Sequence, residues 1–123
     1  GLRGGSDENN NRFSAISYND DLKHVEMGAK YLEGTTMAQQ STSKFLFVRP
    51  DVKALFSFLR GVVFANSKAC TITGPPGIGK SFATYVFLCT LLETHIITHV
   101  SFGMSFPSFV QFNHGAKTVG LLG

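Results

Sequence analysis

The residues of this sequence that are best suited to chemistry form one glycine-rich stretch that runs into a lysine and a serine. The stretch consists of Gly74, Pro75, Pro76, Gly77, Ile78, Gly79, Lys80 and Ser81. It fits the pattern G-x-x-x-x-G-K-[ST], in which backbone amides surround a phosphate. Glycine lacks a Cβ, so the chain can wrap closely around such an anion. The stretch therefore predicts a phosphate-binding loop.

The residue types at the end of this loop indicate a nucleotide with its metal ion. We expect the Lys80 ammonium to reach the β- and γ-phosphates, and the Ser81 hydroxyl to coordinate Mg²⁺. No Asn-Lys-x-Asp motif for guanine follows the loop. ATP and Mg²⁺ are therefore the expected cofactors. The expected binding residues are Gly74, Pro75, Pro76, Gly77, Ile78, Gly79, Lys80, Ser81 and Phe82.

The flanking segments are those that such a loop requires. The β-rich run 69–73 predicts a strand directly before the loop, and the apolar residues of 82–92 predict a helix after it. Further strands are expected at 96–102 and 109–112, whereas 115–123 offers little order. The predicted fold class is α/β, a partial P-loop NTPase domain ordered strand, loop, helix, strand, with a helical N-terminal extension.

Composition divides the chain into three parts. Residues 1–12 are rich in Gly, Ser, Asp and Asn and are expected to be a disordered N-terminus. Residues 13–43 are expected to hold a short helical segment and a polar linker. Residues 44–123 are expected to form a truncated P-loop nucleotide-binding domain, since the chain of 123 residues is small for such a domain.

Two helices are predicted before the loop. The first starts at Asn19 or Asp20 and ends near Gly34. The second starts at Pro50, because proline suits the first helical turn, and ends near Gly61, with 62–65 either a last turn or a strand. Their apolar positions lie on one face of each helix: Leu22, Val25, Ala29 and Leu32 in the first, and Val52, Leu55, Phe56 and Leu59 in the second.

The acidic and basic groups that hydrolysis requires are missing downstream of the loop. A P-loop ATPase holds its metal with an acid at the end of another strand. Glu93 is the one acidic residue after Ser81, and it lies about 18 Å away at the helical rise of 1.5 Å per residue. No arginine follows Arg60. We therefore assign no catalytic residue and expect hydrolysis only if a longer protein supplies the missing groups.

Composition also bears on partners. The net charge is +3 and the basic residues are scattered, so no dedicated nucleic-acid site is expected. Hydrophobic residues make up 43% of the chain, which favours a protein partner that covers exposed apolar surface. An alternative function is therefore a non-catalytic protein-interaction or effector module with a relic loop. No apolar run is long enough to span a membrane.

Cysteine and histidine usage points to a reducing compartment and away from a metal centre. Cys70 and Cys89 lie in apolar runs without C-x-x-C spacing, so both are expected to be buried free thiols in an intracellular protein, cytoplasmic or nuclear. His95 and His99 share strand parity, but a zinc site needs three or four ligands. They are therefore interpreted as ordinary surface or edge histidines.

The region 45–92 resembles one group of P-loop ATPases. The similar residues are Phe47-Val48-Arg49-Pro50, the run Thr73 to Phe82, Tyr85 and Leu91-Leu92. The group comprises the retrotransposon hot spot proteins of trypanosomes and the Crinkler-type proteins of oomycetes and fungi. Its loop is also similar to that of AAA+ and STAND ATPases. The resemblance implies ATP·Mg²⁺ binding by 74–81, a eukaryotic source and an intracellular setting. The sequence departs from the group in lacking the acidic strand.

Overall fold

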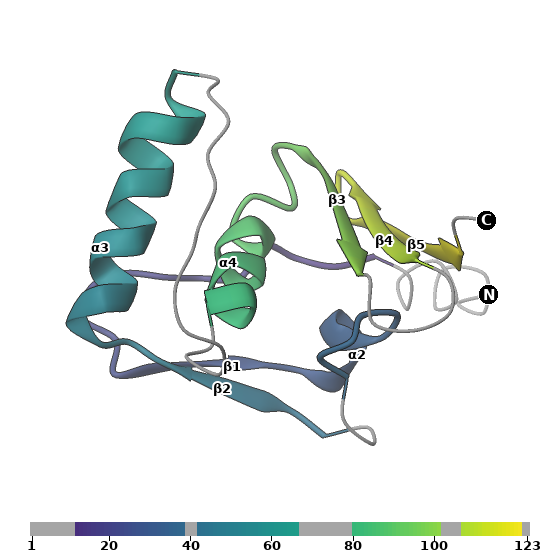
Figure 1. Ribbon diagram of the computed structural model, residues 1–123, viewed down its shortest axis with the longest axis horizontal. Helices are drawn as coiled ribbons and strands as arrows, with labels where there is room; N and C mark the ends of the chain where they lie inside the picture. Colours follow the sequence, from purple (N-terminus) through teal and green to yellow (C-terminus); the bar gives the residue numbers. More distant parts are fainter. Residues whose placement is uncertain (1–11, 39–41, 67–79, 102–106, 122–123) are drawn as a thin grey trace, which may run out of the picture.

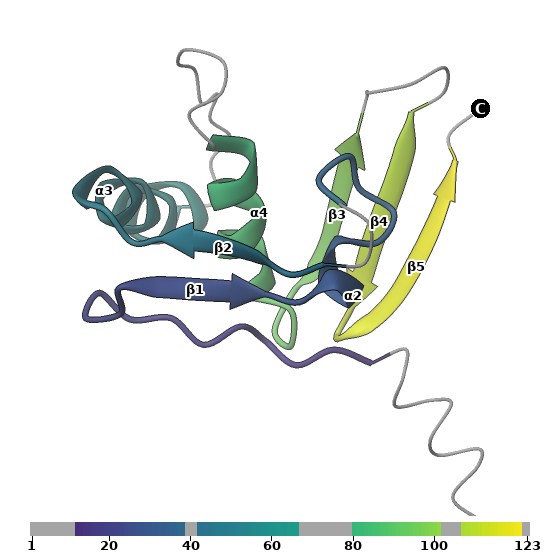
Figure 2. The same ribbon diagram turned by 90° about the horizontal axis from the view of Figure 1, so that it is seen from below.

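The computed structural model describes residues 12–38, 42–66, 80–101 and 107–121. These residues form a mixed α/β structure with two small antiparallel sheets. Helix α4 lies between α3 and the three-stranded sheet, and the two-stranded sheet packs against α4 through β2 (Figures 1 and 2). The elements in order are β1 (His24–Met27), α2 (Ala29–Leu32), β2 (Lys44–Phe47), α3 (Pro50–Phe58), the π-helix η1 (Leu59–Phe64), α4 (Lys80–Cys89), β3 (Ile96–Ser101), β4 (Ser108–Asn113) and β5 (Ala116–Leu121).

Helix α3 starts where the sequence predicts. Arg49 is extended, with φ −93° and ψ 168°, and Pro50 opens the first turn. Of the predicted apolar face, Val52, Phe56 and Leu59 are buried. The helix continues past Gly61 as η1 to Phe64, so 62–64 belongs to its last turn and not to a strand.

The helix predicted between Asn19 or Asp20 and Gly34 is wrong over most of its length. Its middle is strand β1, which pairs antiparallel with β2, and its end is the four-residue helix α2. Val25 and Met27 are buried on one face of β1. The apolar residues of this segment fit the spacing of a helix as well as that of a strand. The pairing of β1 with β2 selects the strand. This pairing also joins the two sides of the predicted boundary at 43 and 44.

The three-stranded sheet has the order β3, β4, β5, with every pair antiparallel. The predicted strands at 96–102 and 109–112 are confirmed as β3 and β4 within the described residues. The expectation of little order after Gly115 is wrong, because 116–121 forms β5. A two-residue turn of His114 and Gly115 closes the hairpin, and both residues have positive φ, 51° and 93°. Such a turn matches the right-handed twist of the paired strands.

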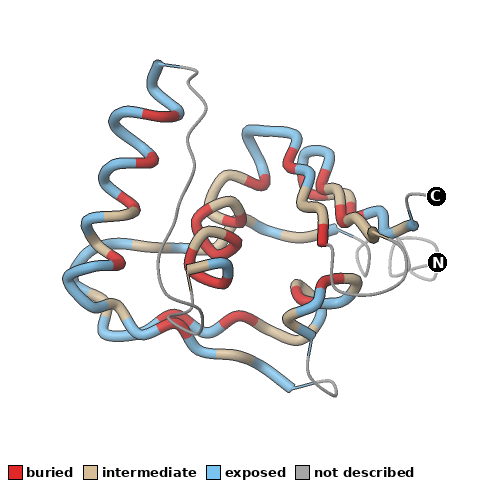
Figure 3. The backbone as a smooth tube through the Cα atoms, in the orientation of Figure 1, coloured by how far each residue is buried: buried red, intermediate tan, exposed pale blue. Residues whose placement is uncertain are grey.

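The core is built around α4, as the concentration of buried residues in Figure 3 shows. Six residues of α4 are buried, on more than one side of the helix: Phe82, Ala83, Tyr85, Val86, Phe87 and Cys89. Helix α4 packs against α3, β2 and β3. The predicted helix after the loop is therefore confirmed, together with the expectation that it is buried on several sides.

The P-loop fold itself stays a prediction. Its strand at 69–73 and its loop at 74–79 lie outside the described residues. All strand pairs between the named strands of the described ranges are antiparallel. These strand pairs establish a mixed α/β structure. They do not show which strands pair with the predicted strand at 69–73.

Lysine 117 is buried among aromatic rings on the inner face of β5, with 7% of its surface exposed. Its Nζ donates a hydrogen bond to the Lys30 carbonyl oxygen. The same atom lies 5.2 Å from the ring centroid of Phe13 and 5.7 Å from that of Phe112. Burial lowers the pKa of Lys117, opposed by the nearby Glu33 carboxylate. The folded state therefore disfavours the charged amine relative to the unfolded chain.

A Lys117→Met variant is expected to change how stability depends on pH. Because the pKa of Lys117 is lower in the folded protein than its ordinary 10.5, the unfolded chain binds more protons between those two values. The stability of the wild-type protein should thus rise relative to the variant as pH increases through that window. Urea unfolding of both proteins from pH 7 to about pH 10.5 measures the difference. A constant difference across this range would contradict the prediction.

Candidate nucleotide-binding site

The structure describes the last three of the nine expected binding residues. The described part of helix α4 begins at Lys80, the lysine of the motif. Lys80 is half-buried and Ser81 is exposed in the first turn, whereas Phe82 is buried. The other six, Gly74 to Gly79, lie outside the described residues. Lys80 and Ser81 therefore lie in the first described turn of the same helix.

Contacts along α4 fix the position of this first turn. The Tyr85 hydroxyl donates a 2.6 Å hydrogen bond to the Tyr31 carbonyl oxygen, which ties α4 to α2. The Thr84 hydroxyl donates to the Lys80 carbonyl oxygen at 2.8 Å. At the other end Cys89 is a buried free thiol, as predicted, and burial raises its pKa to about 12. A helix held along its length presents its N-terminal turn in a defined place.

The first described turn of α4 carries positive charge. Lys80 contributes a full charge there. A second amine lies nearby, because Lys44 Nζ of β2 is 4.9 Å from the centroid of the Phe82 ring. Charges of this sign and backbone amides at a helix start attract phosphate groups. Sequence reasoning did not find Lys44, because only the packing of β2 against α4 brings it close.

The histidines that the sequence singled out lie in different surroundings. His99 in β3 is half-buried, with its ring centroid 4.9 Å from that of Tyr85, and burial lowers its pKa. His95 is exposed before β3 begins, and its Nδ1 lies 2.8 Å from the Thr94 hydroxyl. Within the four described ranges, no group of three or more His, Cys, Asp or Glu side chains could hold a metal ion.

Glu93 lies beyond the opposite end of α4 from Ser81. Helix α4 ends at Cys89, and the Glu93 carboxylate accepts a 2.8 Å hydrogen bond from the Ala15 amide. It also lines a cavity together with residues from both ends of the described chain. Sequence reasoning missed this cavity, because its other residues lie in segments for which no structure was predicted.

Comparison with known proteins gives no neighbour for this chain: no family model, curated protein or solved structure matches it. Among the described residues, no helix has both the length and the apolar character needed to cross a bilayer.

Proposed function

We propose that the chain binds ATP·Mg²⁺ through 74–81, as a P-loop domain whose hydrolytic groups come from outside this sequence. The observation that carries the proposal is that Lys80 and Ser81, the last two residues of the motif, lie in the first described turn of helix α4. In this arrangement the Lys80 amine would bind the β- and γ-phosphates, and the Ser81 hydroxyl would supply one ligand to Mg²⁺. The bound metal would neutralise phosphate charge and orient the terminal phosphate.

Among the described residues after Ser81, Glu93 is the one acidic side chain, and its position does not suit hydrolysis at the proposed site. The carboxylate that follows Ser81 in sequence, that of Glu93, accepts a hydrogen bond from Ala15 beyond the far end of α4. The three strands after α4 contain no Asp or Glu. Positioning a water for attack and holding the metal from a second strand therefore require residues from another part of a longer protein or from a partner.

A Ser81→Ala variant tests the proposed role in metal binding. Alanine keeps the helix start, because it has the highest helix propensity, but it removes the Mg²⁺ ligand. Calorimetric titration with ATP should show about a tenfold weaker affinity than wild type when Mg²⁺ is present. The two proteins should bind ATP equally when Mg²⁺ is chelated. Ser57→Ala, at an exposed position of α3, serves as the matched control.

The same variant can also contradict the proposal. An equal affinity of Ser81→Ala and wild type for ATP in the presence of Mg²⁺ would remove Ser81 from the site. GTP in place of ATP then tests the choice of base, and we expect weaker binding of GTP.

A protein-interaction module is the second candidate, favoured by the outer face of the two-stranded sheet. On β2, Phe45 is 46% and Phe47 is 65% exposed. The His24 ring of β1 lies beside both, with centroids 5.4 Å and 6.3 Å away. Exposed aromatic residues of this kind often contact other proteins. A wild-type chain that is a monodisperse monomer in size-exclusion chromatography would count against this candidate.

A further inference from the structure

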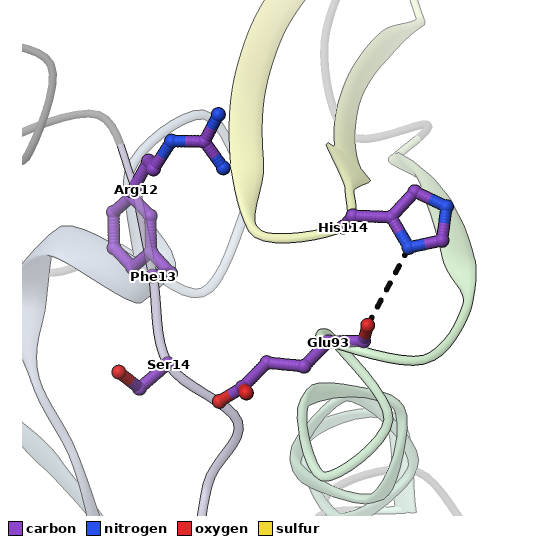
Figure 4. Close-up of a pocket in the computed structure, with 5 residues that line it drawn as sticks. All are labelled: Arg12, Phe13, Ser14, Glu93 and His114. Atoms are coloured by element: carbon purple, nitrogen blue, oxygen red, sulfur yellow. Dashed lines mark hydrogen bonds between the residues drawn. The ribbon is translucent and has the colours of Figure 1, made fainter.

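A cavity lies past the C-terminal end of α4, away from the proposed nucleotide site. Its volume is about 420 Å³. Three segments line it: the chain before β1, the turn after α4 and the β4 to β5 turn (Figure 4). In Figure 4, the N-terminal residues lie along one side and His114 along the other, and the Glu93 side chain reaches across the base. The lining residues are Arg12, Phe13, Ser14, Glu93 and His114.

The first lining segment is held rigidly against the rest of the fold. Arg12 forms a β-bridge with Ala116, and the Phe13 amide donates a 2.8 Å hydrogen bond to the Gly115 carbonyl oxygen. The Tyr31 hydroxyl donates to the Ser14 carbonyl oxygen at 2.7 Å. These contacts fix the backbone of residues 12–14 beside the cavity.

Two opposite charges face this cavity without pairing with each other. Among the described residues the ion pair is Arg49 with Asp51, and Arg12 forms none. The Glu93 carboxylate uses Oε2 to accept the Ala15 amide hydrogen, which leaves Oε1 for another donor. A ligand with a negative group near Arg12 and a positive group near Glu93 would therefore satisfy both charges.

The histidine on the far side occupies a backbone conformation that suits other residues better. His114 has φ 51°, in the left-handed region, where Asn or Gly is the usual choice in a two-residue hairpin turn. Its Nδ1 lies 3.4 Å from the Glu93 carbonyl oxygen, so the ring is oriented towards the turn after α4. The imidazole is thus present at the cavity despite the preference of the turn.

We propose that this cavity binds a small zwitterion that carries a carboxylate and an ammonium group, of which an α-amino acid is the simplest. The Arg12 guanidinium binds the carboxylate, and the Glu93 carboxylate binds the ammonium. Because the His114 Nδ1 donates to the Glu93 carbonyl oxygen, the Nε2 of the same ring accepts a hydrogen bond from the ammonium. The site is independent of nucleotide binding and goes beyond the function proposed above.

The test is an NMR titration of the full chain with L-phenylalanine, N-acetyl-phenylalanine, phenylalanine amide and inorganic phosphate. L-phenylalanine should shift amide signals of residues 12–15, 93 and 114 at concentrations of about 10 mM or below. Acetylation removes the positive charge and amidation removes the negative one, so each should weaken binding about tenfold. Phosphate binding as tight as that of L-phenylalanine would overturn the proposal. So would the absence of any shift with L-phenylalanine.

Variants assign the two charges separately. Arg12→Gln should weaken L-phenylalanine binding about tenfold, with no such loss for phenylalanine amide, which lacks the carboxylate. Glu93→Gln keeps an oxygen for the Ala15 amide, and it should weaken L-phenylalanine but not N-acetyl-phenylalanine. Arg60→Gln, at an exposed position of η1, is the control and should bind like wild type. Unchanged affinity in both Arg12→Gln and Glu93→Gln would overturn the proposal.

His114→Asn separates binding from folding. Asparagine suits the left-handed turn, so the melting temperature should stay equal or rise by a few degrees. The affinity for L-phenylalanine should fall although the turn is intact. A variant that melts like wild type and binds L-phenylalanine equally well would remove His114 from the site and overturn its assigned role.

Discussion

A Lys80→Ala variant is expected to lose ATP·Mg²⁺ binding, with an affinity at least about a hundredfold below that of wild type. The lysine supplies the one full positive charge within the motif, and its amine is proposed to contact the two terminal phosphates. Alanine removes this charge and keeps the helix start, because Thr84 bonds to the backbone carbonyl of residue 80. Isothermal titration calorimetry with ATP and Mg²⁺ measures the loss.

Two controls make this result specific. Lys23→Ala removes an exposed lysine before β1, and it should bind ATP like wild type. Circular dichroism should show the same helix content and melting temperature in Lys80→Ala as in wild type. A well-folded Lys80→Ala protein with unchanged affinity for ATP would contradict the assignment of 74–81 as a nucleotide site.

The second large effect is expected from Gly34→Ala, which should destabilise the protein by about 3 kcal/mol. Gly34 has φ +89°, and a Cβ there would lie 2.7 Å from Val119 Cγ1 and 2.9 Å from Val110 Cγ2. Val110 is fully buried, so it has little room to move. Backbone strain and the steric clash therefore both lower the stability of Gly34→Ala. Urea unfolding should show a lower midpoint with a similar slope.

Gly61→Ala is the matched control for this change. Gly61 lies in η1, and an added Cβ would meet nothing within 4 Å. Alanine favours helix over glycine by about 1 kcal/mol, so this variant should be as stable as wild type or more stable. Equal stability of Gly34→Ala and Gly61→Ala would contradict the packing described around the end of α2.

The parts of the fold that the sequence predicted are those with strong local signals. Pro50 marks the start of α3, and the dense apolar run of α4 marks a buried helix. Strand β1 could not be identified, because Val25 fits a helical face as well as a strand and only its partner β2 decides. Strand β5 was missed although Gly115 marks a hairpin turn, because His114 replaces the usual Asn before it.

The two candidate sites also differ in how far the sequence alone could predict them. The loop at 74–81 is contiguous in sequence, so its pattern could be recognised directly. The supporting charge of Lys44 reaches α4 only through packing of the two-stranded sheet. The cavity past the C-terminal end of α4 combines Arg12, Glu93 and His114 from three distant segments. No spacing rule links such residues, so tertiary structure alone brings them together.

The attachment of the N-terminal segment has a consequence for how the protein folds. The Ala15 amide bonds to Glu93, 78 positions later in the chain, and Lys117 bonds to the Lys30 carbonyl oxygen, 87 positions earlier. Contacts between residues so far apart slow folding, because the long intervening chain must be ordered before they form. During synthesis, Arg12 and Phe13 must therefore wait for Gly115 and Ala116, their backbone partners, to leave the ribosome. Phe13 likewise waits for Phe112, its aromatic partner in β4.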